Sequence, residues 1–309
     1  MDNKGITLLV VDDEPEIRML IADYLEDDEG YTVLTAENGK DALDNVLSAH
    51  KVDLVLSDIN MPVMKGFELL HEVRERYPET KRVLITAYNV EDYIDMALKY
   101  DVGNIFVKTT PFNFDELSSM LTNLLSEDIF GVGRYLEPGF EQRCFAIKRG
   151  DALDKDVKQI TEVLPPGPAG KKLNLVLVEL LTNAIFYGIR KENPERKEEW
   201  DYEFELFDSD AIQITAGWDS RKYAISITDN GGRLQKKDVL YWLHRQVAHD
   251  DAGVPVGIGD SHGRGFFIAR RYIDRLVINI APAKKTEVVI INYTAEVYQG
   301  SKPLYINEI

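Results

Sequence analysis

The first 126 residues alternate regularly between short apolar or β-branched runs and segments in which apolar residues recur with helical spacing. The runs predict strands at Ile6–Val11, Tyr31–Thr35, Asp53–Ser57, Arg82–Ile85 and Asn104–Val107. The other segments predict helices at Pro15–Glu26, Gly39–Ala49, Gly66–Arg76, Glu91–Lys99 and Phe114–Leu125. Such repeats indicate an α/β domain built on a doubly wound, five-stranded parallel sheet.

Polar side chains stand where these predicted strands end. Asp12 and Asp13 follow the first strand, Asp58 the third, Thr86 the fourth and Lys108 the fifth. Ligands of open parallel sheets bind at the carboxyl ends of the strands, so these side chains are expected to meet. Three carboxylates at one place need a cation, and oxygen ligands favour Mg²⁺. There Asp58 is placed as a nucleophile toward a phosphoryl group, with Lys108 and Thr86 on the phosphoryl oxygens.

These stretches, VVDDEP, LVLSDINMP, VLITAY and FVKTTPF, resemble a bacterial response-regulator receiver domain of flavodoxin-like fold, covering residues 1–126. The resemblance implies phosphorylation of Asp58 by a cognate histidine kinase. It also implies Mg²⁺ bound by Asp13, Asp58 and the backbone carbonyl of Asn60, with Asp12 close by.

Two positions depart from the receiver pattern. The family usually has a proline directly after the lysine, whereas Thr109 and Thr110 precede Pro111 here. An aromatic switch residue is usual three positions before the lysine, and that position holds Ile105. We expect phosphorylation to survive both changes, and the usual route of signal transmission to be altered.

The pattern changes after residue 126, and we predict a connector at 127–145 followed by a second domain at 146–309. Helices are expected at Leu153–Leu164 and Lys171–Gly188, and strands at Tyr202–Phe207, Ala211–Trp218, Tyr223–Thr228, Leu276–Ile280 and Glu287–Tyr293. Consecutive strands with no helix between them indicate an α+β layer.

Three separate pieces of this second half suggest a nucleotide site. Glu179 and Asn183 are four residues apart and therefore share one face of a helix. A strand then ends in TDNGG, which contains Asp229 and Gly231. Finally, HGRG places Gly263, Arg264 and Gly265 at a helix start, where phosphate can approach free backbone N–H groups.

In this order the pieces resemble the GHKL (Bergerat) ATP-binding sandwich of histidine kinases, gyrase, Hsp90 and anti-sigma-factor serine kinases. The resemblance implies ATP as cofactor, with Asn183 on Mg²⁺, Glu179 as base and Asp229 on adenine. Gly231 would border the base, and the Gly263–Gly265 turn would border the phosphates. Residues 233–262 would form a mobile lid with hinge-like Gly253, Gly257 and Gly259. Two positions depart from the family pattern: Arg233 stands where the family has glycine, and Tyr187 stands where His or Lys is frequent.

The branch of the fold bears on the function. None of the histidines lies between residues 127 and 170, which disfavours a self-phosphorylating histidine kinase. The run GRGFFIARRYIDRLVINIAP, followed by TEVVI, resembles the anti-sigma serine-kinase branch, which implies phosphorylation of an antagonist protein and binding of a sigma factor. The alternative is a module that holds ATP only to shape a surface that sequesters a protein.

The net charge of the chain disfavours some classes of binding partner. Acidic residues number 53 and basic residues 36, which gives a formal charge of −17 and disfavours binding to nucleic acid or to an anionic membrane. The single cysteine, Cys144, fits a reducing compartment. No export signal is visible, and polar residues interrupt the apolar segment Leu173–Phe186. We therefore expect a soluble cytoplasmic protein, and a homodimer, since both resembled families often dimerise.

Overall fold

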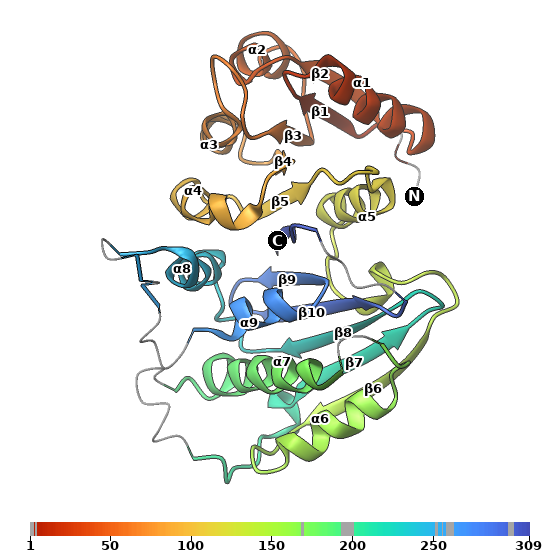
Figure 1. The fold of residues 1–309 in the computed structure, drawn as a ribbon, viewed down its shortest axis with the longest axis vertical. Coiled ribbons are helices and arrows are strands. Elements are labelled where there is room, and N and C mark those ends of the chain that lie inside the picture. The colour runs from red at the N-terminus through yellow and green to blue at the C-terminus, as the bar shows by residue number, and fades with distance from the viewer. Residues whose placement is uncertain are drawn as a thin grey trace. The chain divides into compact units, whose positions relative to one another are not determined.

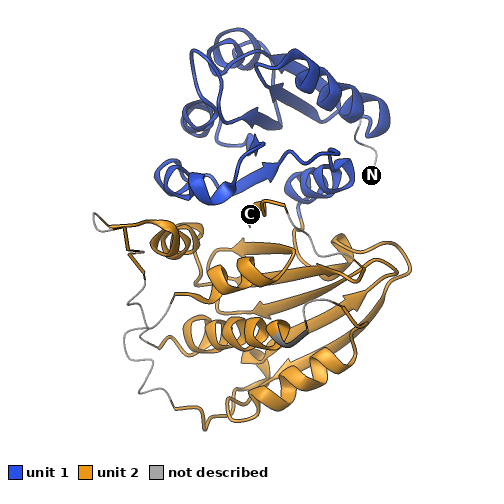
Figure 2. Cartoon of the chain, viewed as in Figure 1, with its two compact units in different colours: residues 1–127 blue, residues 128–309 orange. Residues whose placement is uncertain are grey.

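The computed structural model describes residues 3, 5–167, 170–192, 201–250, 253–254, 256–257, 263–295 and 300–309. The chain divides into two compact units, residues 1–127 and 128–309, which are coloured separately in Figure 2.

The first unit is the predicted parallel sheet. Its strands are β1 (Thr7–Val11), β2 (Thr32–Ala36), β3 (Leu54–Asp58), β4 (Lys81–Thr86) and β5 (Asn104–Val107). Within this unit they lie in the order β2-β1-β3-β4-β5, and every pair is parallel. This order is the flavodoxin-like one, and it confirms the doubly wound sheet.

The helices of this unit follow the strands in turn. They are α1 (Pro15–Asp23) with the π-helical η1 (Tyr24–Asp28), α2 (Gly39–Asp41) with η2 (Ala42–Leu47), α3 (Gly66–Arg76), the 3-10 turn η3 (Val90–Tyr93), α4 (Ile94–Tyr100) and α5 (Phe114–Leu125). Pro15 occupies the start of α1, where its missing N–H costs nothing. The side chain of Asn113 caps α5 by accepting from the Glu116 N–H at 3.1 Å.

The second unit has a mostly antiparallel sheet. Its strands are β6 (Glu141–Ile147), β7 (Ile212–Trp218), β8 (Lys222–Asp229), β9 (Arg275–Ala281), β10 (Lys285–Tyr293) and β11 (Leu304–Glu308). The order is β11-β9-β10-β8-β7-β6, and only the β11–β9 pair is parallel.

Helices cover one face of this sheet (Figure 1). They are α6 (Leu153–Glu162), α7 (Gly170–Thr182), which continues as the π-helical η5 (Asn183–Ile189), α8 (Lys236–Val247) and α9 (Gly265–Tyr272). Two short 3-10 turns, η4 (Val132–Arg134) and η7 (Asp208–Asp210), complete the unit. The apolar face of α7 is fully buried through Val176, Leu177, Leu180 and Leu181.

The α7–η5 helix is apolar as well as long. Residues 172–189 have a mean hydropathy of 1.3, enough by length and composition alone for a membrane span, and 44% of this segment is buried inside the protein. A core helix of a soluble domain meets the same criterion, so the segment is weak support for a membrane span.

The structure corrects three sequence predictions in this half. Residues Tyr202–Phe207 form no regular strand; the segment makes a single bridge between Glu205 and Arg149, and Phe207 is 81% exposed. Strand β6 begins inside the predicted connector and crosses its predicted end at residue 145, and β11 was not predicted. Strand β6 escaped because it is largely exposed and lacks apolar alternation. Residues 128–145 therefore belong to the second unit.

Candidate functional site

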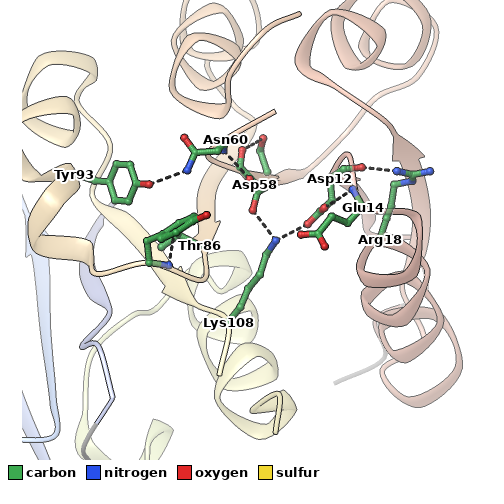
Figure 3. Close-up of polar contacts among 10 residues, drawn as sticks. Asp12, Glu14, Arg18, Asp58, Asn60, Thr86, Tyr93 and Lys108 are labelled. Atoms are coloured by element: carbon green, nitrogen blue, oxygen red, sulfur yellow. Dashed lines mark hydrogen bonds and ion pairs between the residues drawn. The ribbon is translucent and has the colours of Figure 1, made fainter. Parts of the chain in front are cut away.

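The first unit gathers charged side chains at the carboxyl edge of its sheet (Figure 3). Asp12 directly follows β1, Asp58 ends β3, and Lys108 directly follows β5. The Lys108 ammonium donates to Asp12 Oδ2 at 2.8 Å and to Asp58 Oδ1 at 2.6 Å. One cation therefore bridges two carboxylates from different strands.

Burial and pairing set the ionisation of this trio. Burial raises the pKa of Asp12, which is 1% exposed, and Lys108 counters only part of that effect. For Lys108, burial by itself lowers the pKa, but the hydrogen bonds and charges of Asp12 and Asp58 outweigh burial and raise it. Lys108 is thus held protonated as the counter-ion of the site.

Backbone groups orient the remaining carboxylate oxygens. Asp58 Oδ2 accepts from the Asn60 N–H at 2.7 Å, and Asp12 Oδ1 accepts from the Glu14 N–H at 2.9 Å. Each carboxylate therefore has one oxygen on Lys108 and the other on a backbone amide. The guanidinium of Arg18 donates to the Asp12 carbonyl oxygen, which further fixes the turn after β1.

The other predicted residues of this edge lie around the trio. Thr86 is 1% exposed, and its hydroxyl accepts from the Tyr88 N–H at 3.0 Å. The Asn60 side chain donates to the Tyr93 hydroxyl at 2.8 Å, a contact that sequence reasoning missed because Tyr93 comes from η3 (Figure 3).

The predicted metal ligands do not converge as three carboxylates. The side chain of Asp13 is exposed, and among the described residues no three His, Cys, Asp or Glu side chains form a group that could hold a metal ion. The Lys108 ammonium lies between Asp12 and Asp58 and is paired with both carboxylates. The available donors are nevertheless all oxygens, which is the chemistry that Mg²⁺ requires.

The second unit contains a cavity of about 280 Å³ between its helices and its sheet. Its walls come from η5, the ends of β8 and β10, the turn after β8, α8 and the start of α9. The residues that line it are Leu180, Asn183, Ala184, Tyr187, Gly188, Glu192, Ile227, Asp229, Arg233, Leu234, Asp238, Trp242, Gly263, Phe266, Thr286 and Val288.

The cavity brings together residues from all three predicted pieces. Asn183, Asp229 and Gly263 line it, whereas Glu179, one turn before Asn183, is half-buried and is not one of the lining residues. The helix widens from α to π geometry at Asn183, and such π segments are frequent at functional sites. Glu179 nevertheless affects Tyr187, which lines the cavity. The pKa of Tyr187 is raised to about 12, first by the burial of Tyr187 itself and then by the negative charge of Glu179.

Asp229 is the buried acid of this cavity. It is 5% exposed, and burial raises its pKa to about 6, against the opposing hydrogen bonds from the Gly231 and Gly232 N–H groups. The Gly231 N–H donates to Asp229 Oδ1 at 3.0 Å. Among the described residues, no ion pair to Asp229 offsets the cost of burying its charge.

The glycines of the site are required by the protein's own packing. A Cβ on Gly231 would lie 2.1 Å from the Gly188 carbonyl oxygen, and one on Gly263 would lie 2.1 Å from the Trp242 ring. A Cβ on Gly265 would lie 2.6 Å from Asn183 Nδ2, so α9 and η5 approach each other closely at the cavity. The Arg264 guanidinium donates to the Gly257 carbonyl at 3.4 Å.

The predicted lid, residues 233–262, is only partly described. It contains α8, a helix that the sequence pattern did not predict, and Gly253 with φ +76°. Gly259 and His262 lie outside the described residues.

Sequence reasoning missed two residues of the cavity. Thr286 is 2% exposed and faces Asp229 across the β10–β8 pair, and its hydroxyl has no hydrogen-bond partner among the described residues. Trp242 reaches the cavity from α8. No local sequence pattern marks these two residues. Thr286 reaches the cavity through the register of β10 with β8, and Trp242 reaches it through the position of α8.

Comparisons with known proteins identify the first unit. Residues 8–122 match the family model of the response regulator receiver domain. Response regulator Rre1 of Synechocystis sp. is 37% identical over 123 residues, which is 39% of this chain and 52% of that protein. A "probable transcriptional regulator" of Pyropia yezoensis, ycf29, is 32% identical over 185 residues, which is 59% of this chain and 81% of that protein.

Solved structures match the same region. The crystal structure of response regulator TrrA from Thermotoga maritima, in complex with Mg²⁺-BeF, is 38% identical, covering 39% of this chain and 99% of that chain with a TM-score of 0.35. The chain matches only part of the length of several relatives. It spans 12% of the sensor histidine kinase RcsC of Escherichia coli, 14% of the sensor kinase LuxN of Vibrio campbellii and about half of Rre1.

Proposed function

The chain belongs to the response regulators of two-component signalling, and from this premise we propose that phosphorylation of Asp58 controls an ATP-binding output domain. The output domain is the second unit, of GHKL type, and it acts as a serine/threonine protein kinase on an antagonist protein in a sigma-factor pathway. The observation that carries this proposal is the cavity in which Asn183, Asp229 and Gly263 meet.

The geometry of the receiver edge supports the phosphorylation step. An Asp58 carboxylate oxygen attacks phosphorus, and the bond from phosphorus to the imidazole nitrogen of the donor kinase breaks. Lys108, already 2.6 Å from Asp58, neutralises the charge that gathers on the phosphoryl oxygens, and the Thr86 hydroxyl would donate to one of them.

The oxygen donors of this edge fit Mg²⁺. Asp13, Asp58 and the backbone carbonyl of Asn60 would hold the ion, with Asp12 beside them. When bound, Mg²⁺ screens the negative charges of the carboxylate and the phosphoryl group from each other. Asp12 is already engaged by Lys108 and by the Glu14 N–H, so Asp13 is the freer ligand.

The cavity of the second unit supports a nucleotide ligand. Its floor is apolar at Ile227 and Val288, as a planar base requires, and the buried Asp229 carboxylate and Thr286 hydroxyl can pair with the polar edge of a base. Gly263 also lines the cavity and precedes the first turn of α9, and the N–H groups at the start of a helix suit phosphate. Asn183 lines the same cavity, and its amide oxygen would join a Mg²⁺ shell made mostly of phosphate oxygens.

A second function is a nucleotide-gated binding module with little turnover. The observation that favours it is that Glu179, the assigned base, does not line the cavity, whereas Asn183 and Asp229 do. In this reading ATP shapes a surface that sequesters a partner protein.

Transcriptional control, which the name of ycf29 suggests for that protein, is a weaker candidate here. The acidic charge of −17 opposes contact with the DNA backbone.

Titration of the full chain with a non-hydrolysable ATP analogue and Mg²⁺ tests the nucleotide proposal. Trp242 lines the cavity, so its fluorescence should change on binding. Asn183→Ala removes the Mg²⁺ ligand and should weaken the affinity, whereas Glu179→Ala should bind like the wild type. Absence of any saturable signal, checked by calorimetry, would contradict the nucleotide assignment.

A further inference from the structure

Strand β10 presents different chemistry on its two faces. Thr286 and Val288 line the cavity. Because successive side chains of a strand point to opposite faces, Lys285 and Glu287 lie on the face away from the cavity. Glu287 is 2% exposed, and burial raises its pKa. A buried carboxylate here needs an explanation that the cavity does not supply.

One partner of Glu287 belongs to the segment that enters the second unit from the receiver. Both carboxylate oxygens accept from the Gly131 N–H, at 3.0 and 3.1 Å. Gly131 has φ +99°, a conformation that glycine adopts without strain, and the turn aims its N–H at this carboxylate.

Neighbouring side chains hold the same segment. Asn279 is paired with Glu287 across β9 and β10, and its amide donates to Glu287 at 2.9 Å, to the Ile129 carbonyl at 2.8 Å and to the Tyr135 hydroxyl at 3.2 Å. The Lys285 ammonium lies 3.7 Å from the centre of the Phe130 ring. Residues 129–135 are therefore bound to β9 and β10 by buried polar contacts.

This segment is also the covalent continuation of the receiver. The last receiver helix, α5, ends at Leu125, four residues before Ile129. A movement of α5 would therefore be transmitted along the backbone to residues 129–135. These residues are hydrogen-bonded to β10, the strand whose Thr286 and Val288 line the cavity. Packed elements of this kind have discrete arrangements and do not deform continuously.

We propose that Glu287 is a positioning residue that ties residues 129–135 to strand β10, so that receiver phosphorylation and occupancy of the cavity bias each other. The identity of the occupant rests on the proposed function. Because linkage is reciprocal, nucleotide must then also change the receiver's affinity for a phosphoryl mimic.

Calorimetry on the full chain tests the proposal, with a non-hydrolysable ATP analogue and Mg²⁺ in the presence and absence of beryllofluoride. In the wild type the two Kd values should differ by about 5- to 150-fold, the usual range of allosteric coupling. Glu287→Gln leaves the Gly131 N–H one acceptor oxygen in place of two. The ratio of the two Kd values should therefore fall toward one. Its Kd without beryllofluoride should stay within about threefold of the wild type, because Glu287 is outside the cavity. Glu141→Gln, at an exposed position of β6, is the matched control and should keep the full ratio.

Hydrogen exchange supplies a readout independent of affinity. The Gly131 amide should exchange slowly in the wild type, change its protection when the analogue binds, and exchange faster in Glu287→Gln. If that variant does not fold, Tyr135→Phe removes only the hydroxyl contact with Asn279 and should reduce the ratio partially.

The outcomes separate the two proposals. A wild type that binds no analogue overturns the proposed function and this inference with it. A wild type that binds the analogue with equal Kd values overturns this inference alone. A Glu287→Gln protein that keeps the full ratio while Gly131 exchanges faster also overturns it.

Discussion

Asp229→Asn should stabilise the second unit while it damages the proposed nucleotide site. Asp229 is 5% exposed, and its pKa rises from 3.8 to about 6 through burial. The folded state therefore holds this proton more tightly than the unfolded chain does. Stability is consequently lost as the pH rises through the window between these two values.

The magnitude follows from the shift. At 1.36 kcal/mol per pKa unit, ionised Asp229 costs about 3 kcal/mol at about pH 7.5, and roughly half of that cost is already present at about pH 5. Asparagine cannot ionise, so it avoids this cost. It keeps an oxygen for the Gly231 N–H but loses the Gly232 hydrogen bond, worth about 1 kcal/mol. The variant should gain about 2 kcal/mol at about pH 7.5, and the gain should be about 1.4 kcal/mol smaller at about pH 5.

Tryptophan fluorescence makes this measurable in the full chain. All three tryptophans, Trp200, Trp218 and Trp242, lie after residue 127, so urea unfolding followed by their emission reports the second unit and not the receiver. Asp201→Asn, at an exposed position, is the matched control for the same substitution. A gain for Asp229→Asn that is equal at both pH values, or a loss at about pH 7.5, would refute the reasoning. The same variant should bind the ATP analogue weakly.

Three further outcomes are expected. Asp58→Asn should abolish labelling by small phosphodonors with Mg²⁺, because Asp58 is the carboxylate assigned as the nucleophile. Undiminished labelling of this variant on a phosphate-affinity gel would contradict that assignment. If the second unit turns ATP over, Glu179→Ala should lower turnover by about 10²–10⁴-fold in a phosphate-release assay, the usual worth of a general base; unchanged turnover would favour the binding module. Gly265→Ala should weaken Mg²⁺-dependent nucleotide affinity in calorimetry, because its Cβ would lie 2.6 Å from Asn183 Nδ2 and displace that side chain, and a wild-type affinity would show that Asn183 is not needed.

Local patterns determined much of the first unit. Alternating apolar runs and helical segments are properties of neighbouring residues, and parallel strands bring their carboxyl ends to one edge. The amino-acid sequence alone therefore assigns Asp12, Asp58, Thr86 and Lys108 to that edge. The same local logic failed for Tyr202–Phe207, because a run of strand-forming residues becomes a strand only if a neighbouring strand accepts it.

Contacts between distant residues were decided only by the tertiary structure. The sequence assigned Lys108 to the same edge as Asp12 and Asp58, but only the folded sheet shows that its ammonium, which follows β5, pairs with both carboxylates. The Asn60–Tyr93 bond likewise joins residues 33 positions apart.

The second unit shows most clearly which features the sequence predicts and which the tertiary structure decides. Its motifs around Asn183, Asp229 and Gly263 are readable because each is a short local pattern. Thr286 lies beside Asp229, and Glu287 beside Asn279, only because β10 pairs with β8 and β9 in one particular register. A shift of one residue would exchange the two faces of β10 and put the buried carboxylate into the cavity. Register depends on the packing of both faces at once, so the sequence determined which side chains were available, and the folded sheet decided which of them meet.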